Sequence, residues 1–435
     1  MIKNIFFIFV IIFLGSSLPA QAQKEYGLKF SSLINDNLSL ENAIRIGLEN
    51  NSDFLTARQE IAIAEQKVNE AKFLFLPQLA LQGTATWYDL DYPMVLSDAV
   101  ANRFLPGQVI SDKRDQFFGV GVTATQYLYS GGRIRNTLKI ARAHLKQTQS
   151  RYESVKNATV LDIKKSFYNL LFAQHYDQLL QELLEKARRW NSRSSTDIWT
   201  QIRQQSLLAQ LEAQRHEASR QMTQAKLALL ASLNKELNAN FSIEGDFSAV
   251  QGEWNLPQLY LRAMELRPEL KSALYALELD NISIDLALSK RYPDIILNAS
   301  YEQLGADTLE DTNKQISLAM RFPLPYNFSA QIAQKKAEQK KSALRRAQIE
   351  DTIRMQVAGS FEEMRFWQEE ALARQQTYQQ LTSLLQKAEK TASKSGAAPL
   401  EALLSYAQVA QSYLDAIRQT LLAKAQLEWS VGQDL

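Results

Sequence analysis

Residues 40–57 read LENAIRIGLENNSDFLTA, and residues 256–273 read LPQLYLRAMELRPELKSA. One constant offset relates the two stretches, and without a gap it also relates Pro77 to Pro293 and Leu79 to Ile295. Each copy has a helical run that ends at a proline, then alternating strands, then a long pair of helices. This recurrence predicts two structural repeats, and such an architecture favours a conduit over an enzyme.

The beginning of the chain has the pattern of a secretory signal peptide at residues 1–22. Lys3 supplies a positive charge, residues 5–14 (IFFIFVIIFL) are apolar, and residues 20–22 (AQA) form a small-residue cleavage site. Ten apolar residues are too few to cross a bilayer as a helix. No later stretch approaches eighteen consecutive apolar residues, so a membrane-inserted form of the mature chain is expected to use strands.

Charge and cysteine content exclude several classes of function. The net charge is +2, and both signs are interspersed along the helical runs, so no strong field for nucleic acid is expected. The chain has no cysteine, which excludes disulfides and thiolate chemistry. An exported protein of this kind must be stabilised by packing or by assembly.

Two long helical hairpins are predicted. Residues 133–244 contain no glycine and no proline and are rich in good helix formers, and a cluster of turn and cap residues at 191–197 divides the run. The first repeat is therefore assigned to residues 23–237, with its hairpin at about 131–237. After a linker at 238–255, the second repeat occupies 256–435, with its hairpin at about 329–429.

Four segments alternate with period two, as strands with two unlike faces do. They lie at about 77–88, 116–128, 293–302 and 315–322, and each has about the ten residues that a tilted membrane strand needs. Aromatic residues gather at both ends of these segments, as in interfacial girdles. Those at one end are Trp87, Tyr88, Phe117 and Tyr301, and those at the other are Tyr127, Tyr129, Tyr292, Phe322 and Tyr326.

The number of strands requires assembly if the sheet lies in a membrane. Even the smallest membrane barrels have eight strands, and an open edge in lipid leaves backbone groups unpaired. The alternative is a soluble sheet whose apolar face covers a core. The predicted helices pair with one another and leave no obvious layer to cover such a sheet, which favours the membrane interpretation.

The sequence resembles the TolC-type outer-membrane efflux protein family over essentially all of the mature chain. The resemblance is carried by residues 40–57 and 256–273, by the strand entry at 76–79 (LPQL) and by residues 126–133 (QYLYSGGR). It implies an α+β membrane protein: a homotrimer in which four strands per subunit complete a twelve-stranded β-barrel in the outer membrane. Long antiparallel coiled-coil helices continue this barrel as an α-barrel across the periplasm.

The resemblance and the residues together give a set of candidate sites. Gly131 and Gly132 are expected to permit the strand-to-helix turn, because glycine adopts a positive φ without strain. The second copy departs from the family with residues 322–329 (FPLPYNFS), and Ala402 and Ser405 stand at the usual acidic positions of the periplasmic aperture. Glu401 is then the nearest acid. Adaptor contacts at the helical tips are assigned to Arg188, Arg189, Arg193, Gly396 and Leu400.

Other chemistry has little support in the sequence. His144, His175 and His216 lack the spacing of a metal site and are expected to be exposed helix residues. No phosphate loop, nucleophile elbow or HExxH motif occurs, so no catalytic residue, cofactor or metal is predicted.

The predicted function is that of a passive exit duct in the outer membrane for small molecules, either drugs or metal ions. Its partners would be outer-membrane lipid, two further copies of the chain, a periplasmic adaptor protein and an inner-membrane transporter. A type I protein secretion duct is an alternative of the same class, and a periplasmic coiled-coil structural protein is an alternative of a different class.

Overall fold

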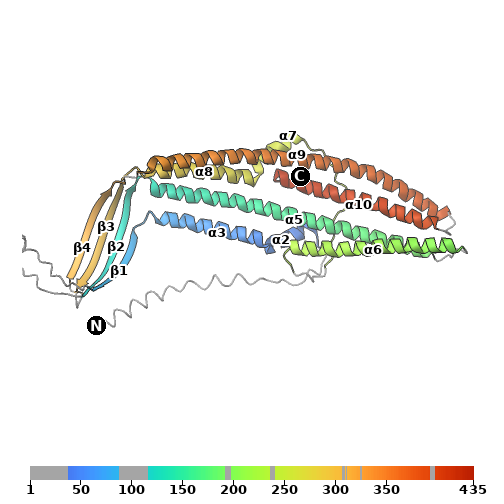
Figure 1. Ribbon diagram of the computed structural model, residues 1–435, viewed down its shortest axis with the longest axis horizontal. Helices are drawn as coiled ribbons and strands as arrows, with labels where there is room; N and C mark the ends of the chain where they lie inside the picture. Colours follow the sequence, from blue (N-terminus) through green and yellow to red (C-terminus); the bar gives the residue numbers. More distant parts are fainter. Residues whose placement is uncertain are drawn as a thin grey trace, which may run out of the picture.

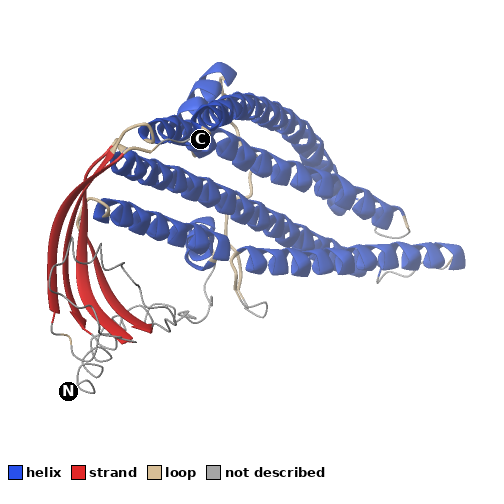
Figure 2. Cartoon of the chain, turned by 60° about the vertical axis from the view of Figure 1, so that its left-hand side comes forward, coloured by secondary structure: helices blue, strands red, loops and turns tan. Residues whose placement is uncertain are grey.

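The structure, a computed structural model, describes residues 38–87, 116–191, 197–235, 241–305, 309, 311–323, 326–391 and 397–435. A four-stranded antiparallel sheet lies at one end, and long helices extend away from it (Figures 1 and 2). The predicted signal peptide lies outside the described residues. None of the described helices is both long and apolar enough to cross a membrane.

Short helices precede the sheet in both halves of the chain. α2 (Leu40–Asn50) and α3 (Ser52–Phe73) lead to β1, and α7 (Leu256–Leu266) and α8 (Pro268–Ser289) lead to β3. Asn51 caps α3 by accepting hydrogen bonds from the amides of Asp53 and Phe54, both at 3.0 Å. The helices α7 and α8 correspond to α2 and α3. The first residues of α2 and α7, and the last residues of α3 and α8, are separated by the same offset that relates the two stretches of sequence.

The sheet has the order β1-β2-β3-β4, and every neighbouring pair is antiparallel. Its strands are β1 (Gln78–Trp87), β2 (Gln116–Ser130), β3 (Asp294–Gly305) and β4 (Asp311–Arg321). β4 begins well before the expected start at 315. Residues 311–314 (DTNK) lack apolar alternation, and only main-chain pairing with residues 301–304 of β3 extends the strand through them.

Two helices of unusual length form the body of the molecule. α5 (Arg133–Asn191) follows β2 and returns as α6 (Ile198–Ser232), while α9 (Phe328–Thr391) follows β4 and returns as α10 (Ala398–Val431). With 59 residues, α5 is about 88 Å long at about 1.5 Å per residue. Figure 1 shows α5 and α9 running along most of the molecule.

The helices form a curved wall with an edge on each side. α9 lies at one edge of the wall, and α8 and α10 lie between α9 and α5. On the other side of α5, α3 and α6 form the second edge. Three apolar clusters hold it together. One joins the two hairpins through α5, α6 and α10, one packs α2 and the segment around Ile243 on α5 and α6, and one packs α7 on α9 and α10. The outer helices, α9 and α3, are those that adjoin the outer strands, β4 and β1.

Candidate functional site: the open sheet and the helical tips

The turn from β2 to α5 depends on two glycines in the left-handed region. Gly131 has φ +60° and Gly132 has φ +84°, as the sequence suggested. A Cβ on Gly131 would lie 2.6 Å from the carbonyl oxygen of Ser289 and 2.6 Å from Cβ of Tyr292, whereas at Gly132 the nearest atom is 3.8 Å away. Gly131 is therefore required both for backbone conformation and for the close approach of the end of α8.

One face of the sheet is apolar and uncovered. Leu79 and Leu81 of β1 are 74% and 58% exposed, and Ile316 and Leu318 of β4 are 81% and 67% exposed. The register places these residues on one face, because Leu79 pairs with Ala124 and Leu318 pairs with Leu297. Contiguous apolar surface of this kind marks a contact with lipid or with another protein.

An irregularity in β2 adds a tyrosine to that apolar face. The pairing with β3 shifts between Tyr127 and Tyr129, so that Tyr129 lies opposite Ile295. Alternation alone would place residues 127 and 129 on the same face, but the bulge moves Tyr129 to the apolar one. Tyr129 is 45% exposed, and Phe322, which follows β4, is 63% exposed.

The edge formed by α9 also carries exposed apolar residues. Leu344, Met355 and Phe366 follow one another at a constant spacing of eleven and are 74%, 75% and 52% exposed. Eleven positions make slightly more than three full turns of an α-helix, so these side chains lie close to one line along it. A stripe of this type is suited to packing against another helix.

The helical tips hold several of the predicted contact residues. Arg188 forms an ion pair with Glu212 at 2.9 Å, and Arg189 donates from Nε to the carbonyl oxygen of Glu185 at 3.3 Å. Glu401 forms an ion pair with Arg203, which joins the beginnings of α10 and α6. Arg193 and Gly396 lie outside the described residues.

Leu400 does not present a contact surface, contrary to the expectation from sequence. Its side chain is 3% exposed and packs in the cluster that joins α5, α6 and α10. Exposed apolar residues among the described residues at this end include Ile198, Trp199 and Ile202 of α6, which are 69%, 79% and 55% exposed. Their signal in the sequence is an isoleucine and tryptophan pair directly after a helix cap, with a second isoleucine one turn later.

Two buried cations fix the end of α10 in the middle of the wall. Lys164 of α5 lies 2.7 Å from Glu428 and 2.8 Å from Asp434. Burial alone would lower the pKa of Lys164, but its hydrogen bonds to Asp434 and Glu428 outweigh this and raise the pKa. Arg267, which is 3% exposed, donates to the carbonyl oxygens of Trp429 and Ser430, both at 3.1 Å, and stacks over the Trp429 ring at 4.4 Å.

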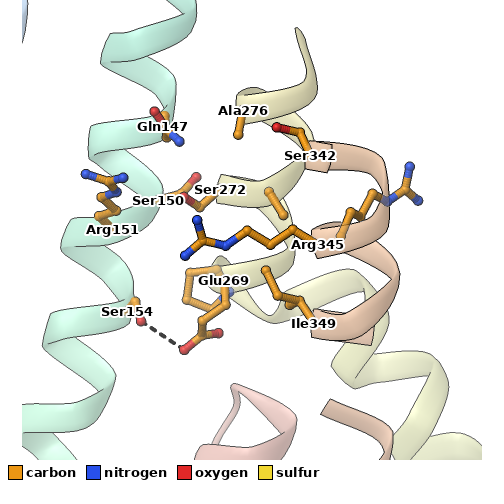
Figure 3. Close-up of a pocket in the computed structure, with 13 residues that line it drawn as sticks. Gln147, Ser150, Arg151, Ser154, Glu269, Ser272, Ala276, Ser342, Arg345 and Ile349 are labelled. Carbon is orange, nitrogen blue, oxygen red and sulfur yellow. Dashed lines mark hydrogen bonds between the residues drawn. The ribbon is translucent and has the colours of Figure 1, made fainter. Parts of the chain in front are cut away.

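A polar cavity of about 290 Å³ lies between α5, α8 and α9 (Figure 3). At its margin Ser154 donates to Glu269 Oε1 at 2.8 Å, while Glu269 Oε2 accepts from Arg267 Nε at 2.9 Å. Glu269 thus connects α5 to the arginine that holds α10. We interpret the cavity as part of the packing at this junction.

The histidines show no arrangement for metal binding. His216 is exposed as expected, but His175 is half-buried and stacks on Phe247 at 4.7 Å, because the segment before α7 packs against α5. His144 is also half-buried, and burial, followed by the positive charges of Lys67 and Arg151, lowers its pKa. Within the described ranges, no three His, Cys, Asp or Glu residues form a potential metal site.

Comparison with known proteins agrees with this geometry. Residues 43–235 match the model of the outer membrane efflux protein family. A search of curated protein sequences gives no significant match.

Solved structures match over almost the whole chain, at identities that show the fold alone. The channel protein CusC is 18% identical, with 92% of this chain and 94% of that chain covered and a TM-score of 0.74. The outer membrane protein VceC of Vibrio cholerae is 15% identical (91% and 96% covered, TM-score 0.73). The MtrE outer membrane channel of Neisseria gonorrhoeae is 17% identical (91% and 89% covered, TM-score 0.72).

The matched family is described as outer membrane efflux proteins, in agreement with the location that the sequence predicts. The same description names efflux as the activity of that family. Residues 43–235 thus resemble the outer membrane efflux protein family in sequence, and about nine-tenths of the chain shares the fold of solved outer membrane channels.

Proposed function

We propose that three copies of this chain form a passive exit duct for small molecules across the outer membrane and the periplasm. The observation that carries this proposal is the pair of aligned edges on one subunit. β4 and α9 form one edge and β1, α3 and α6 form the other, so the sheet and the wall are open on the same two sides. When the β4 and α9 edge of one subunit meets the β1, α3 and α6 edge of the next, the sheet and the helical wall are both continued, and a ring of subunits closes both.

Strand direction supports the closure. Because the four strands alternate, β1 and β4 are antiparallel to each other. When β4 of one subunit meets β1 of the next, the alternation continues without a break. Three subunits then give a ring of twelve antiparallel strands, which leaves no backbone edge in lipid. In this assembly the two repeats of each chain would supply six equivalent pairs of strands and six helical hairpins.

The exposed side chains have matching roles in the trimer. The apolar face of the sheet would contact lipid, and the stripe of Leu344, Met355 and Phe366 would pack on the next subunit. The helical tips at Ile198, Trp199 and Arg188 would meet a periplasmic adaptor, which connects the duct to an inner-membrane transporter. Energy for export would come from that transporter, because the duct has no turnover of its own.

Disulfide cross-linking tests the edge-to-edge contact, since the natural chain has no cysteine. Ala80→Cys in β1 is combined in turn with a cysteine at each of residues 315–319 of β4. A covalent trimer is expected at one or two of these positions, all on the same face of β4, because side chains alternate between the two faces of a strand. Ala80→Cys with a cysteine at Gly359, far along α9, serves as the control and should remain monomeric on a denaturing gel. Absence of cross-linked trimer at every scanned position contradicts the contact.

Ion selectivity tests Glu401 as part of the aperture at the tips. Its partner Arg203 is exposed, so neutralising Glu401 should cost less than about 1 kcal/mol of stability. Glu401→Gln is expected to shift single-channel selectivity towards anions, because Arg203 is left without its carboxylate, and the Arg203→Gln/Glu401→Gln double variant should return towards the wild-type value. Unchanged selectivity in both variants would remove Glu401 from the conducting path.

A further inference from the structure

We propose that the outward face of α5 next to the sheet binds the anionic lipid headgroups of the membrane leaflet that faces the helices. The proposal rests on the proposed function, because it requires the sheet to lie in the membrane. The face is defined by Arg135, Lys139, Arg142 and Lys146, which are all exposed and which we call the basic ladder.

The basic ladder is a straight row on one side of α5. Its positions are related as i, i+4, i+7 and i+11, which keeps the side chains within about 60° of one another around the helix. Residues 133–152 contain six basic residues and no acidic one. Arg135, Lys139 and Arg142 form no ion pair with another described residue, and Lys146 lies over the Tyr275 ring at 5.7 Å.

Helix stability does not explain these charges. The amino-terminal end of a helix carries partial positive charge and favours acidic side chains, while basic ones there are unfavourable. α5 has no acidic residue in its first turn. A row of cations over its first four turns that form no ion pair within the described part of the chain is suited to an anionic partner outside the subunit.

The basic ladder lies on the same side of the molecule as the apolar face of the sheet. Arg133 forms an ion pair with Asp294 at 3.2 Å, and Asp294 alternates with Ile295 and so lies on the polar face of β3. Two positions further along the helix, Arg135 points about 200° away from Arg133. Arg135 therefore lies on the same side of the molecule as Tyr129 and Ile295, which is the side of the apolar face.

An apolar face, then aromatic residues, then basic residues follow one another along this side of the molecule, as they do where a protein leaves a membrane. The apolar face ends in the exposed aromatic residues Tyr129 and Phe322, and the first cations follow within two turns of α5. Aromatic side chains favour the headgroup level, and basic residues just outside it attract anionic lipids. At about 1.5 Å per residue, Arg135 and Lys139 lie about 3 Å and about 9 Å along α5 from its first residue, and Lys146 about 20 Å.

The opposite end of the sheet has the opposite charge in the sequence. Residues 88–115, between β1 and β2, and residues 306–310, between β3 and β4, together contain seven acidic and three basic residues. Anionic headgroups would thus be favoured at the helical end of the sheet and not at the other end. An anionic membrane surface accounts for this asymmetry, and it accounts for the position of the ladder beside the aromatic residues.

A lipid competition experiment on the purified trimer tests the proposal. Native mass spectrometry would count lipids retained from an equimolar mixture of phosphatidylglycerol and phosphatidylcholine in detergent. One basic residue near an anionic surface is worth about 1 kcal/mol, or about fivefold in binding. We expect the wild type to retain phosphatidylglycerol at least fivefold in excess, and we expect high salt to reduce this excess.

Two charge-matched variants on the same face locate the binding surface. Arg135→Gln/Lys139→Gln is expected to abolish the preference. Arg142→Gln/Lys146→Gln should keep most of it, because these residues lie further from the sheet, and salt weakens their attraction to the headgroups more strongly. Equal loss in both variants would overturn the membrane assignment and indicate an elongated soluble polyanion or an acidic protein as the partner.

The remaining outcomes separate this inference from the proposed function. A trimer that conducts ions but has no lipid preference overturns the lipid site and leaves the duct intact. A change of ion selectivity in Arg135→Gln/Lys139→Gln without a change of lipid preference would place the ladder inside the duct and also overturn the lipid site. A monomer that does not enter lipid contradicts the duct and the lipid site together.

Discussion

Arg267→Ala is expected to lower the free energy of unfolding of the helical wall by about 3–5 kcal/mol, the usual cost of removing one partner from a buried ion pair. Arg267 is 3% exposed and donates to Glu269, to Gln356 and to two carbonyl oxygens at the end of α10. Its loss leaves Glu269 without its charged partner, with only the Ser154 hydroxyl still donating to it, and removes the side-chain donor to the last turn of α10. Thermal unfolding followed by circular dichroism in detergent measures the effect.

Arg354→Ala is the matched control for that experiment. Arg354 lies on α9, is exposed and, among the described residues, pairs only with Asp351 on the same helical turn, so its removal should cost less than about 1 kcal/mol. Arg267→Lys is expected to fall between the two, since a lysine keeps the charge but not the fork of donors. Equal midpoints for Arg267→Ala and Arg354→Ala would show that Arg267 does not hold the end of α10.

Gly131→Ala is expected to reduce assembly strongly, whereas Gly132→Ala is expected to be tolerated. Both positions have a positive φ, which costs an alanine about 1–2 kcal/mol. Only at Gly131 does the added Cβ meet backbone, at 2.6 Å from the carbonyl oxygen of Ser289, so β2, α5 and α8 must move apart. Overpacking of this kind costs about 1–3 kcal/mol more.

The yield of trimer in outer-membrane fractions measures the difference between the two glycine variants. Because the pair shares the left-handed conformation, the comparison isolates the close approach to α8. Similar yields for both variants would contradict the tight junction that the structure shows at Gly131.

Local sequence patterns predicted most helices and strands of this fold, because periodicity and the positions of glycine and proline depend on residues close together in the chain. The constant offset between the two copies located the helices around the sheet, and the absence of glycine and proline after residue 132 indicated the long α5. Alternation placed β1 within a residue at each end. It did not find the start of β4, where pairing with β3 and not side-chain pattern sets the boundary.

Long-range contacts at the candidate sites were not predictable in the same way. Glu401 was identified as an acid at the tip, but its ion pair with Arg203 joins the two hairpins, which come from different halves of the chain. Leu400 is an apolar residue beside a turn, and only the packing of α10 against α5 and α6 decides that it is buried. The bulge that moves Tyr129 to the apolar face depends on the register of β2 against β3, a strand from the second half of the chain.

The central claim is that one subunit is a third of a closed wall, with four strands and two open edges. Its most direct test is the native mass of the protein extracted from the outer membrane with its surrounding lipid. We predict a single species of three chains, with cross-links between β1 and β4 of neighbouring subunits. A single chain that is stable in water without lipid would contradict the claim.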